Sequence, residues 1–470
     1  MSVSQELARF VAETKFEDLP QGVVHEAKHT LLDCIGCALA GIQVDKGKIS
    51  VELGRRLGGP PESSIIGVGD KVSCSSAAFA NGELINAQDY DTILAPLGHV
   101  SPYVVPPPMA LAESTGAPGK ELILATVLAH EIAARIASAL TSATSFTHGR
   151  TGERRVRWAP VFGVSQCIFG GTVGVGKILK LNYQKLTHAL GIAGHFCPVP
   201  TFMKWAETVP SAMTKYGSAG WISMGGVTSA LLADKGYVGD TTVFDGEYGF
   251  WRFFASEKWE PVKVMDKIGE KWLFLETNYK PYPCCRIMHG ALDCFNSIID
   301  QNNLMPEDIE SVKVYCRPLG EKPLWGNNDL ATHIDAQFSV AYVFAAAAHR
   351  VKLEDWQDLD TMRNSKILEF MKKVSHETHP GGEESLRKDA RSRIGKAEVV
   401  AKGKVFSEER TYPRGVPFTD VATSEHELVD KFKRNAARIL TQGKVDEAIK
   451  SLLELEKVEN VAEVMKLVTL

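Results

Sequence analysis

Several apolar segments of this chain are rich in glycine and alanine, and they limit the folds that are open to it. They include LLDCIGCALAG (31–41), QCIFGGTVGVGKILKL (166–181) and WISMGGVTSALLADKG (221–236), beside the longer ELILATVLAHEIAARIAS (121–138). Apolar residues recur in them three and four positions apart, which predicts helices. Because glycine and alanine let helix axes approach closely, these segments predict a compact helical bundle rather than helices lying on a sheet.

Two short patterns inside these helices imitate binding motifs. GGTVGVGK resembles a phosphate-binding loop, but no strand-like run precedes it and the Walker spacing is absent. Cys34 and Cys37 form a CxxC, but no second cysteine pair stands at zinc-finger spacing. We interpret both patterns as helix packing. The nine cysteines are scattered through apolar segments, which indicates buried, reduced thiols.

Strand-like sequence appears only after about residue 265. β-branched or alternating runs occur in KWLFLETNYKPYP (271–283), ESVKVYC (310–316) and KAEVVAKGKVFSEERTYP (396–413). The last of these resembles a hairpin that turns around Ala401-Lys402-Gly403. After about residue 415 the chain returns to charged helices, whose charge pairs four residues apart mark solvent-facing surfaces.

The order of these segments predicts a mainly α protein of two domains. Residues 1–265 and 415–470 are expected to form a large all-helical domain. Residues 266–414 are expected to form a smaller α+β domain inserted between the two helical stretches. The 470 residues are enough for two such domains, each with its own core.

The charge of the chain is nearly balanced, since 53 basic residues face 57 acidic ones and the formal net charge is −4. This gives no electrostatic reason to expect nucleic acid as the main ligand. The start, MSVSQELARF, lacks the basic and apolar regions of a secretory signal, and no segment approaches the roughly 20 apolar residues of a membrane span. We therefore expect a cytoplasmic protein with no nucleic-acid or membrane partner.

The first candidate for chemistry lies in NGELINAQDYDTILAPLGHVSPYVVPPP (81–108). Asp89 and Asp91 precede His99 in a segment rich in proline and glycine, between two helical segments. Polar side chains in such a segment can reach a cleft. The alternative is that the two aspartates cap a helix and that His99 faces solvent.

A second candidate is Thr214-Lys215, immediately before a helix rich in small residues. The positive end of a helix repels a lysine unless an anion is present, and that anion could be a substrate carboxylate. A solvent-facing lysine is the alternative. An arginine-rich stretch, HGRTGERRVRWAP (148–160), supplies the weaker candidates His148 and Arg157, with a surface loop or subunit contact as the alternative.

The last candidate is TNYKPYPCCRIMHG (277–290), where Lys280, Arg286 and His289 crowd around two prolines. Three such groups could bind carboxylates by charge-assisted hydrogen bonds. A structural role at the start of a helix is the alternative. We recognise no arrangement of His, Cys and Asp at metal-ligand spacing, and GxSxG is absent.

Taken in order, these segments resemble the MmgE/PrpD family, which includes 2-methylcitrate dehydratases, cis-aconitate decarboxylases and iminodisuccinate epimerases. The resemblance covers nearly the whole chain. It rests on LLDCIGCALAG, NGELINAQDYD with GHVSPYVVPP, SAMTKYGSAGWISMGGVTSALLADKGYVGD, KPYPCCRIMHGALD and DAQFSVAYVFA. It implies a helical domain formed from both chain ends, an inserted α+β lid, an active site in the cleft, a homodimer, and no metal or organic cofactor.

The resemblance also assigns residues by motif. The family's aspartate falls on Asp89, its loop histidine on His99, and its two lysines on Lys215 and Lys280. One departure matters: many members, decarboxylases in particular, carry a histidine where this chain has Arg157-Trp158. The threonine that some decarboxylases place shortly after the paired acids is also missing, and Ile93 stands near that position. Both departures weigh against decarboxylation.

We therefore expect a cofactor-independent lyase for a small di- or tricarboxylic acid, first of all a 2-methylcitrate dehydratase-like hydro-lyase. A cis-aconitate-type decarboxylase, an iminodisuccinate-type epimerase and a non-catalytic carboxylate-binding protein are the alternatives. In this hypothesis His99, oriented by Asp89, is the general base or acid, and Asp91 is a second candidate for proton transfer. The residues expected to hold substrate carboxylates are Lys215, Lys280, Arg157, Arg286, His289 and Thr214.

Overall fold

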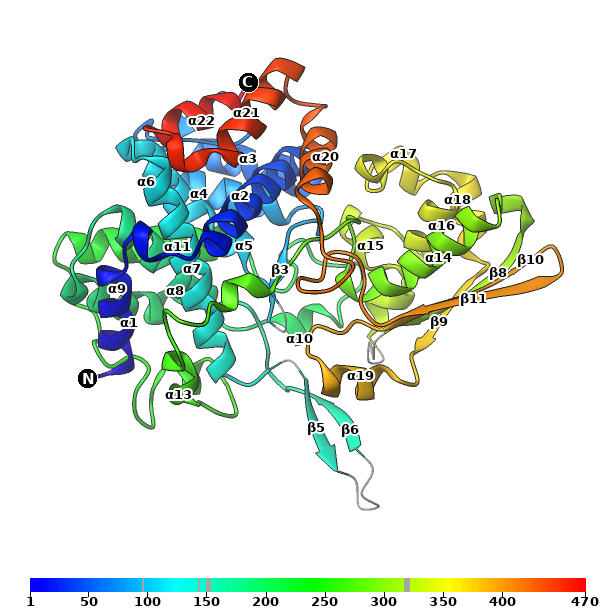
Figure 1. Cartoon of the computed structure of the whole chain (residues 1–470), viewed down its shortest axis with the longest axis horizontal. Helices are drawn as coiled ribbons and strands as arrows, with labels where there is room; N and C mark the ends of the chain where they lie inside the picture. Colours follow the sequence, from blue (N-terminus) through cyan, green and yellow to red (C-terminus); the bar gives the residue numbers. More distant parts are fainter. Residues whose placement is uncertain (95–96, 143, 149–153, 317–321) are drawn as a thin grey trace.

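The computed structural model describes residues 1–94, 97–142, 144–148, 154–316 and 322–470, of which 144–148 and 154–158 are described by their backbone alone. The protein is mainly α, as the sequence predicts (Figure 1). The helices before residue 266 are α1 (Val3–Glu13), α2 (Gln21–Gly41), α3 (Asp45–Leu57), α4 (Cys74–Asn86), α5 (Ser101–Val104), α6 (Pro106–Thr115), α7 (Gly119–Ala139), α8 (Cys167–Ile178), α9 (Tyr183–Phe196), α10 (Phe202–Trp205), α11 (Ala219–Asp234), α12 (Phe250–Phe253) and α13 (Pro261–Met265).

The glycine-rich segments are packed helices. A side-chain carbon at Gly170 of α8 would lie 2.2 Å from the carbonyl oxygen of Ala129 in α7, so that only glycine fits there. This confirms helix packing as the interpretation of GGTVGVGK. Cys34 and Cys37 are buried in α2, and all nine cysteines lie in described parts of the chain as free thiols.

Helix α7 is long and apolar enough to cross a membrane by length and composition alone, which the sequence analysis did not recognise. In this structure 94% of its apolar window is buried inside the molecule, as in the core helix of a soluble protein. It packs against α8, α6 and α2. The same test finds no second helix of that length among the residues described.

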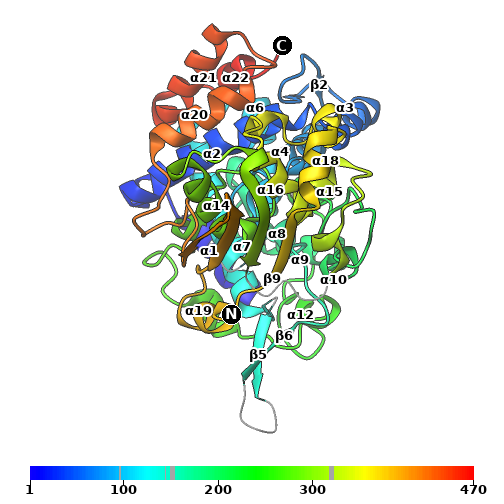
Figure 2. The same ribbon diagram turned by 90° about the vertical axis from the view of Figure 1, so that its right-hand side faces the viewer.

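Most of the extended structure forms one four-stranded sheet of order β11-β10-β8-β9. Strands β8 and β9 are parallel, and the other neighbours are antiparallel. Helix α14 packs on β10 and β11. The sheet and its helices lie together on one side of the helical body, at the right in Figure 1 and toward the viewer in Figure 2. The elements of this region are α14 (His289–Gln301), β8 (Ile309–Cys316), α15 (His333–Phe338), α16 (Val340–Ala348), α17 (Leu359–Met362), α18 (Ser365–Met371), β9 (Val374–Thr378), α19 (Gly382–Lys388), β10 (Gly395–Ala401) and β11 (Lys404–Arg410).

The predicted hairpin is confirmed. Ala401 pairs with Lys404, and the two turn residues Lys402 and Gly403 have φ of 51° and 68°. Positive φ at both positions is typical of the type I′ turn that suits a twisted hairpin. By contrast, 271–283 contains only the two-residue strand β7 (Thr277–Asn278), because residues 273–276 form a 3₁₀ turn instead.

The last three helices return to the start of the chain. Helices α20 (Glu425–Ala436) and α21 (Gln442–Leu453) pack on α2, and α22 (Val461–Leu467) packs on α6 (Figure 1, orange and red beside blue). A buried ion pair between Asp33 and Lys431, 2.7 Å long, joins α2 to α20. The domain bounds 1–265, 266–414 and 415–470, and a lid role for the middle segment, stay predictions.

Four short strands complete the described extended structure outside the site. They form two antiparallel pairs, β1 (Ser63–Ser64) with β2 (Lys71–Val72) and β5 (Thr144–His148) with β6 (Arg154–Trp158). The pair β5–β6 projects away from the helical body in both views (Figures 1 and 2).

Candidate active site

The buried carboxylate of Asp89 forms ion pairs with two lysines from distant parts of the chain. Lys215 Nζ lies 2.6 Å from Oδ1 of Asp89, and Lys280 Nζ lies 2.5 Å from Oδ2. Lys280 also donates to the Asp89 carbonyl at 2.6 Å, and Lys215 to the carbonyl of Asn86 at 3.0 Å. All three charged side chains are buried. Since a buried charge is costly unless it is paired, the carboxylate and the two ammonium groups hold one another in place.

Two members of this cluster have an uncommon backbone conformation. Asp89 follows the end of α4 with φ of 55°, and Lys215 precedes α11 with φ of 51°. Residues with a side chain rarely adopt positive φ, so surrounding contacts must hold them there. Such positions concentrate at functional sites.

A small sheet of order β4-β3-β7 brings His99 to the same place. Ile93 of β3 (Ile93–Leu94) pairs with His99 of β4 (Gly98–His99) on one side and with Asn278 of β7 on the other. Lys280 follows β7 by two residues, and its Nζ lies 3.4 Å from His99 Nε2. The register of three short strands therefore places the imidazole beside the lysine.

Asp91, and not Asp89, orients His99. The Nδ1 of His99 lies 2.5 Å from Oδ2 of Asp91, and the other Asp91 oxygen accepts from Asn86 Nδ2 at 3.3 Å. Asp89 lies 3.5 Å from Nε2 and is occupied by the lysines. The expected roles of the two aspartates are thus corrected. Because Nδ1–H donates to Asp91, Nε2 carries the lone pair of a neutral ring.

The electrostatic surroundings keep this imidazole neutral. Burial lowers the pKa of His99; Asp91 opposes this shift and Lys280 reinforces it. Burial raises the pKa of Asp89, but Lys215 and Lys280 hold that pKa well below its ordinary value. Burial also raises the pKa of Asp91, but the interaction with His99 outweighs this effect and lowers that pKa below its ordinary value. A neutral imidazole beside two ionised carboxylates can accept a proton at neutral pH.

Lys215 can exchange a proton near neutral pH. Burial lowers its pKa to about 8, with Asp89 opposing the shift and Lys46 adding to it. Lys46 is itself paired with Glu83 at 2.9 Å. Lys215 Nζ donates to two oxygens of the described residues, Asn86 O and Asp89 Oδ1, which leaves one N–H bond for a ligand.

The other predicted site residues fall in different places. Arg286 and His289 are buried and touch each other, with Arg286 Nη1 3.1 Å from His289 Nδ1. Thr214 is exposed and lines a pocket of about 410 Å³ together with Trp205 and Ser218. His148 and Arg157 have side chains outside the described residues.

Sequence reasoning missed Tyr216 and Asn86. The Tyr216 hydroxyl donates to Asp89 Oδ1 at 2.9 Å, and its ring stacks on His99 with centroids 4.9 Å apart. Asn86 Nδ2 donates to Tyr216 and to Asp91. The sequence offered one indication of Tyr216, because it directly follows the candidate Lys215. That indication was weak, since tyrosine and asparagine beside apolar helices usually serve packing and capping.

The charges of the cluster also shift the pKa values of His333 and Cys285. Burial lowers the pKa of His333 to about 3, and Lys46 and Lys215 lower it further. Its Nε2 has no hydrogen-bond partner within the described ranges. Burial raises the pKa of Cys285 to about 12, with Asp89 adding to the shift. Both groups are therefore neutral at pH 7.

One group of described residues could hold a metal ion, and the sequence analysis did not recognise it. His25 and His29, one turn apart on α2, face Glu425 at the start of α20, and their ligand atoms lie within 4.8 Å of one another. His29 Nε2 is 3.1 Å from Glu425 Oε2, and His25 Nε2 is 4.0 Å from it. The set is separate from the Asp89 cluster, and two imidazoles with a carboxylate suit a divalent transition metal.

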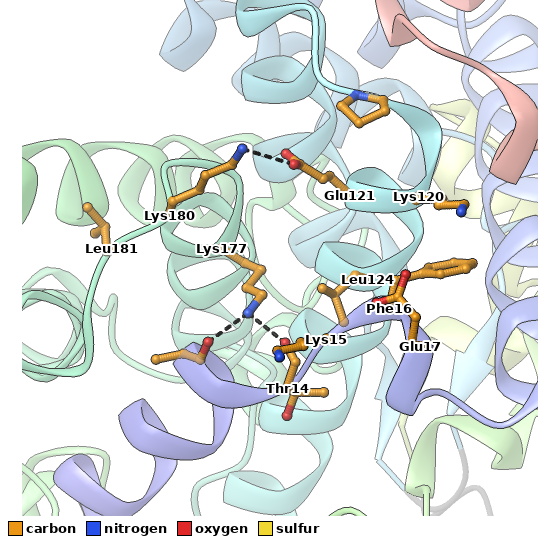
Figure 3. A pocket seen from close by; sticks show the side chains of 12 residues that line it. Thr14, Lys15, Phe16, Glu17, Lys120, Glu121, Leu124, Lys177, Lys180 and Leu181 are labelled. Carbon is orange, nitrogen blue, oxygen red and sulfur yellow. Dashed lines mark hydrogen bonds and ion pairs between the residues drawn. The ribbon is translucent and has the colours of Figure 1, made fainter.

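A larger cavity of about 470 Å³ lies elsewhere, between the end of α1, the start of α7 and the end of α8 (Figure 3). Two of the lysines that line it, Lys177 and Lys180, already have hydrogen-bond or ion-pair partners. Lys177 Nζ donates to the carbonyls of Val11, Ala12 and Thr14. Lys180 pairs with Glu121 at 3.1 Å (Figure 3). Among the described residues, no histidine or aspartate lines this cavity, so it differs from the Asp89 cluster in the groups that it offers for chemistry.

Comparison with known proteins assigns the class. The MmgE/PrpD N-terminal domain matches residues 5–262, and the MmgE/PrpD C-terminal domain matches residues 282–455. The chain belongs to the MmgE/PrpD family. The resemblance recognised in the sequence is thereby confirmed.

Relatives of known name cover almost the full chain at low identity. The chain is 25% identical to a cis-aconitate decarboxylase-like protein of Aspergillus oryzae, over 100% of this chain and 97% of the relative. It is 24% identical to cis-aconitate decarboxylase of Aspergillus terreus, over 99% and 95%, and 24% identical to that of Homo sapiens, over 98% and 93%.

Proposed function

We propose that the protein is a lyase for a small di- or tricarboxylic acid, and first of all a hydro-lyase that dehydrates a 2-methylcitrate-like hydroxy acid. The observation that carries the proposal is the Asp91–His99 pair beside two buried lysines. It joins a neutral base to a concentration of positive charge. Membership of the MmgE/PrpD family supports the same class of substrate.

The chemical problem is a proton on carbon next to a carboxylate. His99 Nε2 accepts that proton, and the electron pair moves into the adjacent carboxylate to give an enediolate-like state. The ammonium groups of Lys215 and Lys280 reduce the charge that accumulates there. Asp91 stabilises the imidazolium.

Loss of water completes the reaction. The electron pair then forms the carbon–carbon double bond, the C–O bond breaks, and the hydroxyl leaves as water with a proton from Lys215. The pKa of about 8 suits Lys215 to this donation. Transfer of the proton from His99 back to Lys215 restores the starting state.

A second candidate is decarboxylation of a cis-aconitate-type acid, which the names of the relatives favour. Here a C–C bond breaks, carbon dioxide leaves, and the carbanion takes a proton from an acid such as Lys215. Two departures weigh against it: Arg157 stands where many decarboxylases have a histidine, and Ile93 stands near the position where some have a threonine. Epimerisation of an iminodisuccinate-type acid would use the same base and return the proton to the other face.

One assay separates these reactions. The purified protein is incubated in D₂O with 2-methylcitrate, citrate, cis-aconitate and iminodisuccinate, and the products are followed by NMR. Dehydration yields an alkene with loss of water, decarboxylation releases carbon dioxide, and epimerisation incorporates deuterium without either loss. Binding without turnover of any substrate would contradict the proposal and favour a carboxylate-binding protein.

Two further expectations accompany the proposal. We propose that the protein is a homodimer, which light scattering during gel filtration tests directly. We also propose a cytoplasmic location, which fractionation of the source cells tests. A monomer, or a protein found outside the cytosol, would contradict the respective expectation.

A further inference from the structure

Arg286 carries a buried guanidinium that is satisfied on one side only. It lies in the 3₁₀ turn Arg286–Met288 that leads into α14, and the residue is 3% exposed. Nη1 donates to the Arg414 carbonyl at 2.7 Å and to His289 Nδ1 at 3.1 Å. Nε and Nη2 have no hydrogen-bond partner in the part of the chain that the structure describes.

Asp293, the acid whose charge most affects Arg286, does not supply the missing acceptor. Asp293 Oδ1 accepts from Tyr282 at 2.8 Å and from Arg414 Nε at 3.1 Å. Its Oδ2 accepts from the Arg414 backbone N–H at 2.8 Å. Burial lowers the pKa of Arg286 to about 9, so the guanidinium stays charged at neutral pH. Buried donors without acceptors destabilise a fold, and native proteins contain few of them.

Arg135 is a buried arginine whose guanidinium nitrogens all have hydrogen-bond acceptors in the protein. The residue is 1% exposed, and its Nε donates to Glu131 at 2.6 Å. Nη1 donates to the carbonyls of Val264 and Asp266, both at 2.9 Å, and Nη2 to that of Lys271 at 2.7 Å. Every nitrogen of Arg135 is thus occupied. The open edge of Arg286 is therefore a property of its site and not of arginine burial.

The open edge has the geometry of a carboxylate receptor. The N–H bonds of Nε and of one terminal nitrogen point in parallel from one side of the planar guanidinium, and they match the two oxygens of a carboxylate. The opposite side of Arg286 is fixed by the Arg414 carbonyl and by His289. Arg286 is thus held in one orientation before any ligand arrives.

A short chain of polar contacts connects Arg286 to the catalytic cluster. His289 Nε2 donates to the Cys284 carbonyl at 3.1 Å, and Lys280 Nζ donates to the same oxygen at 3.2 Å. With Nε2 protonated, His289 Nδ1 accepts from Arg286. Burial, Arg286 and Lys280 keep the pKa of His289 well below its ordinary value, so the ring stays neutral. Arg286 is thus linked to Lys280 through His289 and the Cys284 carbonyl.

We propose that the Nε/Nη2 edge of Arg286 binds a second, unreactive carboxylate of the substrate and so selects polycarboxylates over monocarboxylates. The inference rests on the proposed function, because it assigns a role to one part of that substrate. The reacting carboxylate lies at Lys215 and Lys280, and the second carboxylate completes the hydrogen bonds that the protein leaves open.

The test compares two unreactive probes that differ in one charge. Succinate has two carboxylates, and in succinamate one of them is a neutral amide. Titration calorimetry measures both affinities for wild-type protein and for Arg286→Gln, and thermal denaturation without ligand measures stability. Arg135→Lys is the matched control, since it alters a buried arginine whose nitrogens are all occupied.

We expect Arg286→Gln to bind succinate about tenfold or more weakly than wild type, and succinamate within about twofold. Its melting temperature without ligand should equal or exceed that of wild type, because a buried unpaired charge is removed. Arg135→Lys should melt at lower temperature and keep the wild-type preference for succinate. Should Arg286→Gln fail to fold, Arg286→Lys makes the same comparison, because it keeps the charge without the fork.

The inference would be overturned if Arg286→Gln bound both probes equally more weakly, or bound neither more weakly. It would also be overturned if the wild-type protein bound succinate and succinamate with the same affinity. A fall in the melting temperature of Arg286→Gln like that of Arg135→Lys, with unchanged probe preference, would assign a structural role instead. Since binding requires no turnover, a protein that prefers succinate through Arg286 but converts no polycarboxylate would contradict the proposed function alone.

Discussion

Two buried groups of charged residues in this protein differ in how completely their hydrogen bonds are satisfied. On α7, Arg135 pairs with Glu131, whose other oxygen accepts from the Phe274 N–H at 3.0 Å. In the Asp89 cluster the lysines are paired, but the contact of His99 Nε2 with Lys280 Nζ is long, at 3.4 Å, and the neighbouring Arg286 keeps an open edge.

The difference separates structural from functional polar burial. The Arg135–Glu131 pair fastens residues 264–274 to α7 and leaves no nitrogen of the arginine for a ligand. The Asp89 cluster holds its parts rigidly and leaves selected atoms open. A fully satisfied buried network stabilises one fold. A network with oriented open groups can bind and transform a small charged molecule.

The largest expected effect is on turnover, in the variant His99→Gln. It removes the base while an amide can still donate to Asp91, so we expect turnover to fall by about 10²–10⁴-fold with the fold retained. Steady-state kinetics with the substrate identified by NMR, together with far-UV circular dichroism, measure both. The control is His130→Gln on α7, whose ring nitrogens contact Thr126 and Ser101. Near-wild-type turnover of His99→Gln would remove His99 from the mechanism.

The next effect is on stability, in Arg135→Met. Loss of the arginine leaves Glu131 buried without its partner, so the free energy of unfolding should fall by about 3–5 kcal/mol. Urea denaturation measures it. Turnover per folded molecule should stay near wild type, because Arg135 does not contact the Asp89 cluster. A variant that loses activity without losing stability would contradict the comparison.

The pH dependence of activity sharpens the role of Lys215. Its pKa of about 8 means that the ammonium is lost above that pH, so kcat/KM should fall by about tenfold per pH unit there. The stability contribution has the opposite sign. Between about pH 8 and 10.5 the unfolded state binds more protons than the folded state at this residue, so the contribution of Lys215 to stability rises with pH.

Kinetics and urea denaturation at several pH values test both slopes. In Lys215→Gln, the free energy of unfolding should rise less steeply with pH, because only the contribution of Lys215 is lost. Activity that stays level from pH 7 to 10 would contradict proton donation by Lys215.

The smallest expected effect is that of Tyr216→Phe. It removes the hydrogen bonds of the hydroxyl with Asp89 Oδ1 and Asn86 Nδ2, and it keeps the ring that stacks on His99. We expect a loss of about 1.5 kcal/mol in stability and a modest fall in turnover. Urea denaturation and kinetics measure the two. A loss of activity as large as that of His99→Gln would make the Tyr216 hydroxyl a participant in the chemistry.

Local features were predictable from the sequence. The β10–β11 hairpin turns at Lys402 and Gly403 as expected, because a two-residue turn with positive φ is encoded by adjacent residues. The glycines of α8 were predicted to serve helix packing, and the close approach of Gly170 to α7 confirms it. The four principal candidates Asp89, His99, Lys215 and Lys280 came from motifs, and their catalytic roles stay predictions.

Pairings between side chains were not predictable to the same degree. Asp89 and Asp91 are two residues apart, and sequence alone gave the wrong one to His99. The positive φ of Asp89 turns the chain so that Asp89 meets the lysines while Asp91 meets the imidazole. The set of His25, His29 and Glu425 was missed for a related reason. Glu425 follows His29 by 396 residues, and the two meet only because α20 packs on α2.

The helices, their glycine faces and the hairpin were predictable, because each depends on neighbours a few positions away in the chain. Which charges meet depends on how distant elements pack. Asp89 pairs with Lys215 and Lys280 across sequence separations of 126 and 191 residues, and the open edge of Arg286 is defined by what its neighbours leave unpaired. Such pairings follow from the packing of whole elements, which exchanges water for protein partners at buried charges.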